Sequence, residues 1–201
     1  NMYKNLKFKL IVIISICWIF KSNAQITLTH NVGNTPIDSG MFSCEGDETW
    51  MRIFDLADFG IGPNEEFAIT SGQIAFSESY SGANLQFRFY RVGPDFPNYP
   101  FSLYPTTLLG TRGIGEAPTI TGAPEIVQTD FDEPVIIPAG TEKILVAVEK
   151  YWGIYDDESS VVRIAGTQED NDVSYYYGCD ESYSLIPTTD LPNNPQPNAN
   201  F

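Results

Sequence analysis

The chain has 26 acidic residues, but the spacing of the residues that could do chemistry completes no catalytic motif. His30 is the sole histidine, and no G-x-S-x-G turn is present to pair with it in a serine hydrolase. Some glycosidases carry two Glu and one Asp on one strand, spaced E-x-D-x-x-E, and use these carboxylates in one catalytic cleft. The nearest match is EGDETW at 45–50, where Glu45 and Asp47 fit and Trp50 replaces the second Glu. We therefore expect a non-catalytic protein, with a carboxylate-pair glycoside hydrolase as the alternative.

Acidic clusters in loops are the candidate metal ligands. Calcium takes six to eight oxygen ligands, and loop carboxylates and backbone carbonyls often supply them. No EF-hand is present, because the segment that starts at Asp170 has Tyr175 where that loop requires glycine. A structural calcium is the one cofactor that the sequence suggests, and its candidate ligands are Glu45, Asp47, Glu48, Asp130, Asp132, Asp170 and Asp172.

Aromatic residues near the acidic segments are the candidate ligand contacts. Sugar-binding proteins stack tyrosine and tryptophan on pyranose faces, and the candidates here are Tyr151, Trp152, Tyr155, Tyr175 and Tyr177. If 172–178 forms a strand, Tyr175 and Tyr177 share one face and Tyr176 lies on the other. The alternative is rim packing with the hydroxyl groups in water, which is a common position for tyrosine.

The N-terminal segment resembles a secretory signal peptide over residues 1–24. Three lysines precede an apolar run at 10–20, and the small residues Ser22 and Ala24 stand before Gln25 as a cleavage site. The run of about eleven residues is shorter than the roughly 20 that a membrane-spanning helix needs. We thus expect a secreted or cell-surface protein with no membrane insertion after cleavage. Cys44 and Cys179 would then be the remaining cysteines, and we expect a disulfide between them.

The charge of the chain argues against nucleic-acid partners. The whole sequence has 11 basic and 26 acidic residues, and the leader removes four lysines but no acid, which leaves a net charge near −19 (7 minus 26). Nucleic acids and anionic membranes are bound through Lys and Arg that neutralise phosphates. The expected partners are instead an extracellular glycan or neighbouring domains of the same polypeptide.

The segments that must position these residues have the sequence pattern of β-strands. Nine short segments show alternation or enrichment in β-branched and aromatic residues, with Gly, Pro, Asn and Asp between them: 25–30, 49–56, 66–76, 84–92, 106–114, 124–131, 142–152, 161–166 and 172–178. Each has an apolar face, so we expect an all-β, two-sheet sandwich with jelly-roll or Greek-key-like wiring. The sandwich would span 25–185. Residues 186–201, rich in Pro and Asn, would form a linker or loop.

Four pieces of sequence together suggest a family. The leader ending SNAQ, SGMFSCEGDETWMRIFDL at 39–56, VIIPAGTEKILVAVE at 135–149 and SYYYGCD at 174–180 resemble a β-sandwich module of secreted, multidomain Bacteroidetes-type proteins, many of them type IX secretion cargo. The resemblance implies a non-catalytic extracellular module for adhesion or glycan contact, or a structural spacer, beside other domains. Such modules close with one more apolar strand, which the resemblance places after Phe201. The segment AGTQEDND at 165–172 departs from the Gly-Ser-Asn turn that is usual there.

Overall fold

The protein is a two-layer β-sandwich. The computed structural model describes residues 25–33, 35–38, 48–80, 83–93, 96, 107–151, 162–167, 172–178 and 186–187. Its elements in chain order are β1 (Glu48–Asp55), the 3-10 turn η1 (Leu56–Phe59), β2 (Phe67–Ser79), β3 (Asn84–Val92), β4 (Thr107–Glu116), β5 (Glu125–Ile137), β6 (Lys143–Tyr151), β7 (Val162–Ile164), β8 (Ser174–Tyr177) and β9 (Ile186–Pro187). No helix in this part of the chain is long and apolar enough to cross a membrane.

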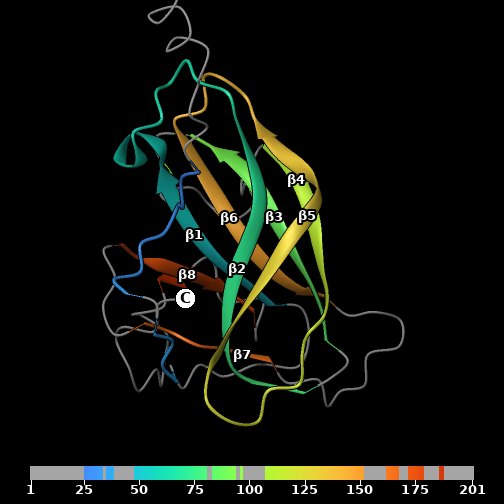
Figure 1. The fold of residues 1–201 in the computed structure, drawn as a ribbon. Helices are drawn as coiled ribbons and strands as arrows, with labels where there is room; N and C mark the ends of the chain where they lie inside the picture. The colour runs from blue at the N-terminus through green and yellow to red at the C-terminus, as the bar shows by residue number, and fades with distance from the viewer. Residues whose placement is uncertain are drawn as a thin grey trace, which may run out of the picture.

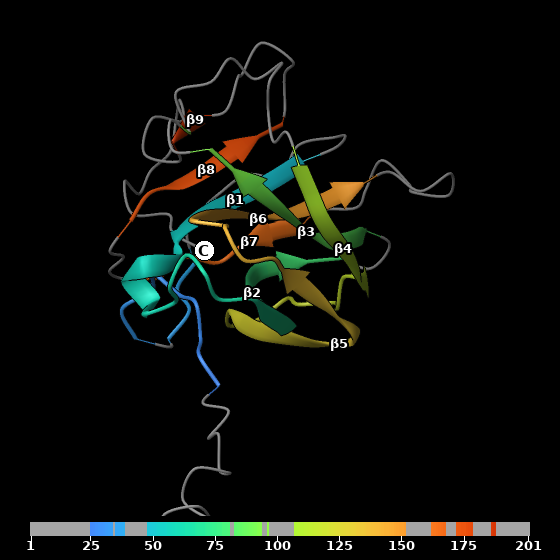
Figure 2. The same ribbon diagram turned by 90° about the horizontal axis from the view of Figure 1, so that it is seen from above.

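Two antiparallel sheets form the layers (Figures 1 and 2). The larger sheet has the order β4-β3-β6-β1-β8-β9 and the smaller one has the order β5-β2-β7. Among the strands that the structure describes, β3–β4 and β8–β9 join neighbours in the same sheet, and every other connection crosses between the two sheets. The all-β sandwich expected from the sequence is therefore confirmed.

Strand alternation explains how the two layers bury a common core. On β3, Leu85, Phe87 and Phe89 point inward and are at most 3 % exposed. On β1 the inward residues include Trp50 and Phe54, which alternation along the strand places on one face. The smaller sheet contributes the facing apolar residues Ile74, Phe76, Val135, Ile137, Val162 and Ile164.

Most predicted strands are confirmed, and β6, which carries a nearly continuous apolar run, is central because it lies between β3 and β1. The prediction of a strand at 25–30 is wrong, because these residues carry no strand pairing. Leu28 and His30 pack against the core by their side chains, and His30 stacks on Phe54 with ring centroids 4.7 Å apart. Alternation alone does not distinguish such a segment from a paired strand.

β5 is longer than the predicted 124–131 and contains a bulge. Its pairing with β2 passes from Ile69–Val135 to Ser71–Asp130, so residues 131–134 leave the ladder. Pro134 is tolerated here because it lies at this bulge on the edge strand of its sheet. After Ile137, the turn at 138–140 carries the chain across to β6 in the other sheet, so the two apolar segments around it do not form a hairpin.

Gly72 does not mark a bulge, although glycine inside a strand often does, because it pairs with Thr129 within the ladder. The irregularity falls between Ile69 and Ser71 instead. A Cβ on Gly72 would lie 2.6 Å from Cζ of Phe87 in the opposite sheet. Glycine is needed at this position because the Phe87 ring rests on its backbone.

Candidate functional site

The outer face of the larger sheet carries two of the aromatic residues singled out from the sequence. Tyr175 and Tyr177 on β8 both face away from the core and are partly exposed, whereas Tyr176 faces inward and is 3 % exposed. The predicted alternation of the three tyrosines is therefore confirmed. Phe96, from the connection after β3, meets Tyr175 edge to face at a centroid separation of 6.5 Å.

An apolar floor supports these tyrosines. Met51 on β1 and Ala147 on β6 lie in register with Tyr175, and both are at most 1 % exposed. Leu145, Tyr90 and Val92 extend the same cluster towards β3. Burial in this cluster raises the pKa of Tyr90 and of Tyr175, so both phenols stay neutral well into the alkaline range. The face therefore offers neutral, amphipathic rings on a fixed base.

A polar row continues from the tyrosines across the sheet. Tyr177 pairs with Thr49, Thr49 with Glu149, and Glu149 with Gln86, so the four residues cross β8, β1, β6 and β3 side by side. With strands about 4.8 Å apart, the row spans roughly 14 Å. All four are partly exposed. The arrangement places hydrogen-bonding side chains next to aromatic rings on one surface.

Glu149 is held in place by two neighbours on β3. Its Oε2 accepts a hydrogen bond from Gln86 Nε2 at 3.0 Å and lies 2.9 Å from Arg88 Nε. The contact with Arg88 is an ion pair rather than an aligned hydrogen bond. Arg88 Nη1 in turn donates to the hydroxyl of Tyr90 at 3.3 Å. These contacts fix a carboxylate and a guanidinium beside the row.

The candidate calcium ligands are scattered over the described part of the chain. Glu48 is completely buried, and its carboxylate contacts Lys150 and Tyr176. Asp130 and Asp132 are exposed on β5, where Asp130 accepts a hydrogen bond from Gln128. Asp172 accepts from the backbone N–H of Val173 and lies 3.9 Å from His30 Nε2. Among the residues that the structure describes, no three potential ligands form a metal-binding group.

Several sequence-based predictions fall on residues outside the described part. These are the disulfide partners Cys44 and Cys179, the candidate ligand contacts Trp152 and Tyr155, and the candidate calcium ligands Glu45, Asp47 and Asp170. Tyr151 is the last residue of β6, where its backbone pairs with Asn84. The disulfide and the calcium site stay predictions.

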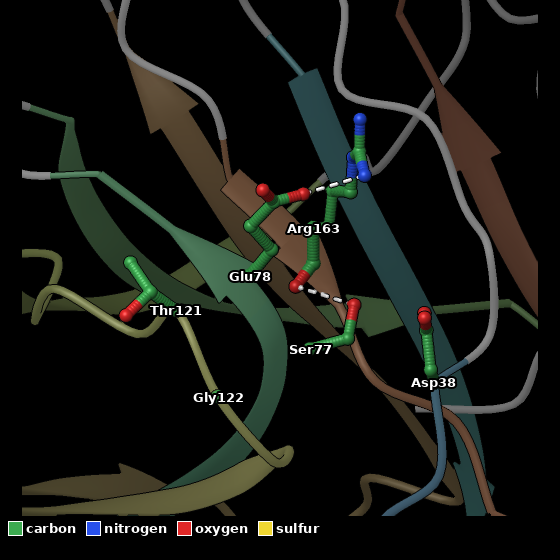
Figure 3. A pocket seen from close by; sticks show the side chains of 6 residues that line it. All are labelled: Asp38, Ser77, Glu78, Thr121, Gly122 and Arg163. Atoms are coloured by element: carbon green, nitrogen blue, oxygen red, sulfur yellow. Dashed lines mark hydrogen bonds and ion pairs between the residues drawn. The ribbon is translucent and has the colours of Figure 1, made fainter.

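A polar hollow at the smaller sheet is the second candidate site (Figure 3). Its volume is about 240 Å³, and its lining comes from β2, β7, the segment between β4 and β5, and the segment that pairs with Gly166: Asp38, Ser77, Glu78, Thr121, Gly122 and Arg163. Arg163 Nη1 lies 2.5 Å from Glu78 Oε2, and Ser77 donates to the Arg163 carbonyl at 3.4 Å. Figure 3 shows this ion pair across one wall of the hollow.

The hollow is smaller and more polar than most ligand sites. Ligand pockets commonly measure about 300 to 1,000 Å³ and have a predominantly apolar lining. Sequence reasoning did not find this site, because its residues come from four separate segments and none belongs to a local motif. The register shift between Phe76 and Glu78 in the β2–β7 pairing accompanies Ser77 and Glu78 at the wall.

His30 is packed against aromatic residues of the core and not exposed at a surface site. Its ring is 7 % exposed, lies between Phe54 and Phe59, and its Nε2 lies 2.8 Å from the carbonyl oxygen of Ile53. Neighbouring Asn31 accepts a 2.5 Å hydrogen bond from Arg52, whose Nε also donates to Ser174. The bonds of His30 and Asn31 attach the segment at 25–31 to β1, and Arg52 also links β1 to β8.

Comparison of the chain with protein-family models, with curated proteins and with solved structures finds no match.

Proposed function

We propose that this protein is a secreted, non-catalytic accessory module that contacts a glycan through the outer face of its larger sheet. The observation that carries the proposal is the row from Tyr177 across Thr49 and Glu149 to Gln86, with Tyr175 beside it. Aromatic rings can stack on the apolar face of a pyranose, and the carboxylate, amide and hydroxyl groups next to them match its hydroxyls. The leader-like segment at 1–24 supports an extracellular location.

The outer face suits a glycan better than the polar hollow does. None of the described residues that line the hollow is aromatic, and Glu78 and Arg163 already form an ion pair with each other there. On the outer face, Glu149 and Arg88 are held by neighbours before any ligand arrives, which lowers the entropy lost on binding. A surface of this length can contact a chain of sugars rather than a single ring.

Binding measurements with variants of the two tyrosines test the proposal. Residues 25–201 would be screened on a glycan array and on whole cells, and the best ligand titrated by calorimetry. Tyr175→Ala and Tyr177→Ala should each weaken binding about 2- to 10-fold, because one aromatic contact contributes about 0.5–1.5 kcal/mol. Tyr80→Ala is the control, since Tyr80 is an exposed tyrosine on the other sheet, at the end of β2. It should leave affinity unchanged.

Two outcomes would contradict the proposal. If the folded protein binds neither glycans nor cells, the spacer hypothesis remains. If purified protein releases reducing sugars from a polysaccharide panel, the module is catalytic, and the hypothesis of a carboxylate-pair glycoside hydrolase replaces the proposal.

A further inference from the structure

A buried group of three polar side chains lies on the inner face of the larger sheet. Glu48, Lys150 and Tyr176 come from β1, β6 and β8, and their exposed fractions are 0 %, 3 % and 3 %. Lys150 Nζ is 3.1 Å from Glu48 Oε2, and the Tyr176 hydroxyl donates to Glu48 Oε1 at 2.8 Å. Each carboxylate oxygen therefore has a different partner, a nitrogen on one side and a phenol on the other.

The backbone fixes this geometry. Glu48 and Lys150 are direct partners in the β1–β6 ladder, and Trp50 is the direct partner of Tyr176 in the β1–β8 ladder. Gly178 closes over the group, since a Cβ there would lie 2.6 Å from the Tyr176 hydroxyl and 3.1 Å from Cγ of Glu48. The amine and the carboxyl group are thus held in contact in a place from which water is largely excluded.

A charged pair in such a place is costly. Taking an ammonium and a carboxylate out of water carries a large desolvation penalty, and their attraction often fails to offset it. Transfer of one proton from Lys150 to Glu48 gives a neutral amine and a neutral carboxylic acid, which an apolar environment tolerates better. These are the two reactants of amide formation. The fold holds them in contact, so their reaction is intramolecular.

We propose that Lys150 and Glu48 condense to an isopeptide bond that links β1 to β6. The neutral Nζ attacks Cδ of Glu48, and the negative charge that develops on Oε1 is stabilised by the Tyr176 hydroxyl. A second Nζ proton passes to Oε2, the Cδ–Oε2 bond breaks, and one water leaves. The Nζ–Cδ bond and the Oε1 carbonyl remain, so atoms and charge balance without an oxidant, a cofactor or an activated donor.

Such a bond would clamp the central strands of the larger sheet. β6 and β1 lie next to each other in the middle of that sheet, with β3 and β8 on their outer sides. A covalent cross-link at the end of the β1–β6 pair would resist separation of the two strands under mechanical load or heat. This inference does not depend on the proposed glycan contact and has its own test.

Mass spectrometry of the wild-type protein decides the question. Residues 25–201, purified folded, would be incubated, denatured, reduced and weighed at high mass accuracy. The expected mass is lower than that of the linear chain by one water, which is distinct from the ammonia that cyclisation of an N-terminal Gln25 would release. Tryptic digestion should yield peptide 25–52 joined to peptide 144–163, with no cleavage after Lys150.

The same two strands supply an internal control. Lys143 and Asp55 are also direct partners in the β1–β6 ladder, but they are 3.8 Å apart and partly exposed, so they should stay unlinked and trypsin should cut after Lys143. Tyr176→Phe keeps the ring and removes the hydroxyl, so it should leave a larger uncrosslinked fraction at each time point. Folded wild-type protein that keeps the full linear mass after long incubation would overturn the proposal, whatever the variants do.

Discussion

At the scale of single residues, the contact between Gly72 and Phe87 shows how one missing side chain sets the spacing of the sheets. The Phe87 ring rests where a Cβ of residue 72 would be, and Phe131 meets the same ring edge to face at 5.7 Å. Protein interiors are close-packed, so an added methyl group cannot be absorbed without movement of the ring or the strand. The glycine thus belongs to the core although it has no side chain.

Gly72→Ala should lower the free energy of unfolding by about 1–3 kcal/mol, the usual cost of overpacking a core. The measurement is the urea midpoint of the variant against wild type at unchanged slope. Gly113→Ala on β4 is the matched control, because nothing lies within 4 Å of the position that its methyl group would occupy and its backbone is not left-handed. Equal stability of the two variants would show that the Phe87 contact is not tight.

At the scale of elements, Arg112 closes one side of the sandwich. Figures 1 and 2 place β4 and β5, the edge strands of the two sheets, at the same side of the molecule. Arg112 on β4 donates from Nε to the Glu133 carbonyl at 2.6 Å and from Nη2 to the Pro134 carbonyl at 2.9 Å. Both carbonyls belong to the bulge of β5, so the guanidinium satisfies groups that the ladder has released.

Arg112→Lys should therefore destabilise the protein although it keeps the charge. A lysine cannot reproduce the fork geometry, so at least one bulge carbonyl loses its donor, at a cost of about 0.5–1.5 kcal/mol. Thermal unfolding of this variant should be compared with that of Arg91→Lys. Arg91 is an exposed arginine with one side-chain hydrogen bond to a backbone carbonyl, that of Gly140. If both variants melt together, the bidentate contact is not what holds the two edges.

The same elements show what could be predicted from the sequence and what could not. The segment at 84–92 alternates so regularly that its predicted bounds match those of β3, because period-two patterning marks a strand with one buried face. Residues 25–30 have a similar local composition but no partner strand, and pairing is not a local property. Nor does any local signal mark Glu48 as buried, since its partners Lys150 and Tyr176 are 102 and 128 residues away. The polar hollow could not be predicted from the sequence for the same reason, because its lining residues are far apart along the chain.

At the scale of the whole molecule, buried tyrosines link the stability of the fold to alkaline pH. Burial, followed by the nearby charge of Glu48 and the hydrogen bond to it, raises the pKa of Tyr176 above its ordinary value of 10.0. Tyr90 and Tyr175 are raised in the same direction, also mainly by burial. Each folded-state phenol therefore holds its proton at a pH where the unfolded chain has released it.

The consequence for stability has a definite sign. Below pH 10 the tyrosines are neutral in both states, so their contribution to the free energy of unfolding is fully present. As the pH rises above that value, the unfolded state loses protons that the folded state keeps, and stability falls by up to about 1.4 kcal/mol per pH unit for Tyr176. Urea unfolding at a series of pH values between about 8 and 11 measures this slope.

Tyr176→Phe separates this tyrosine from the other groups that titrate at high pH. The variant should lose less stability than wild type between the two ends of the range, so the difference between the two proteins should shrink or reverse as the pH rises. Because burial is the largest cause of the raised pKa, the effect should persist whether or not Glu48 keeps its charge. Parallel curves for the two proteins would show that Tyr176 ionises in the folded state as readily as in the unfolded chain, and that the inner face around Glu48 is open to water.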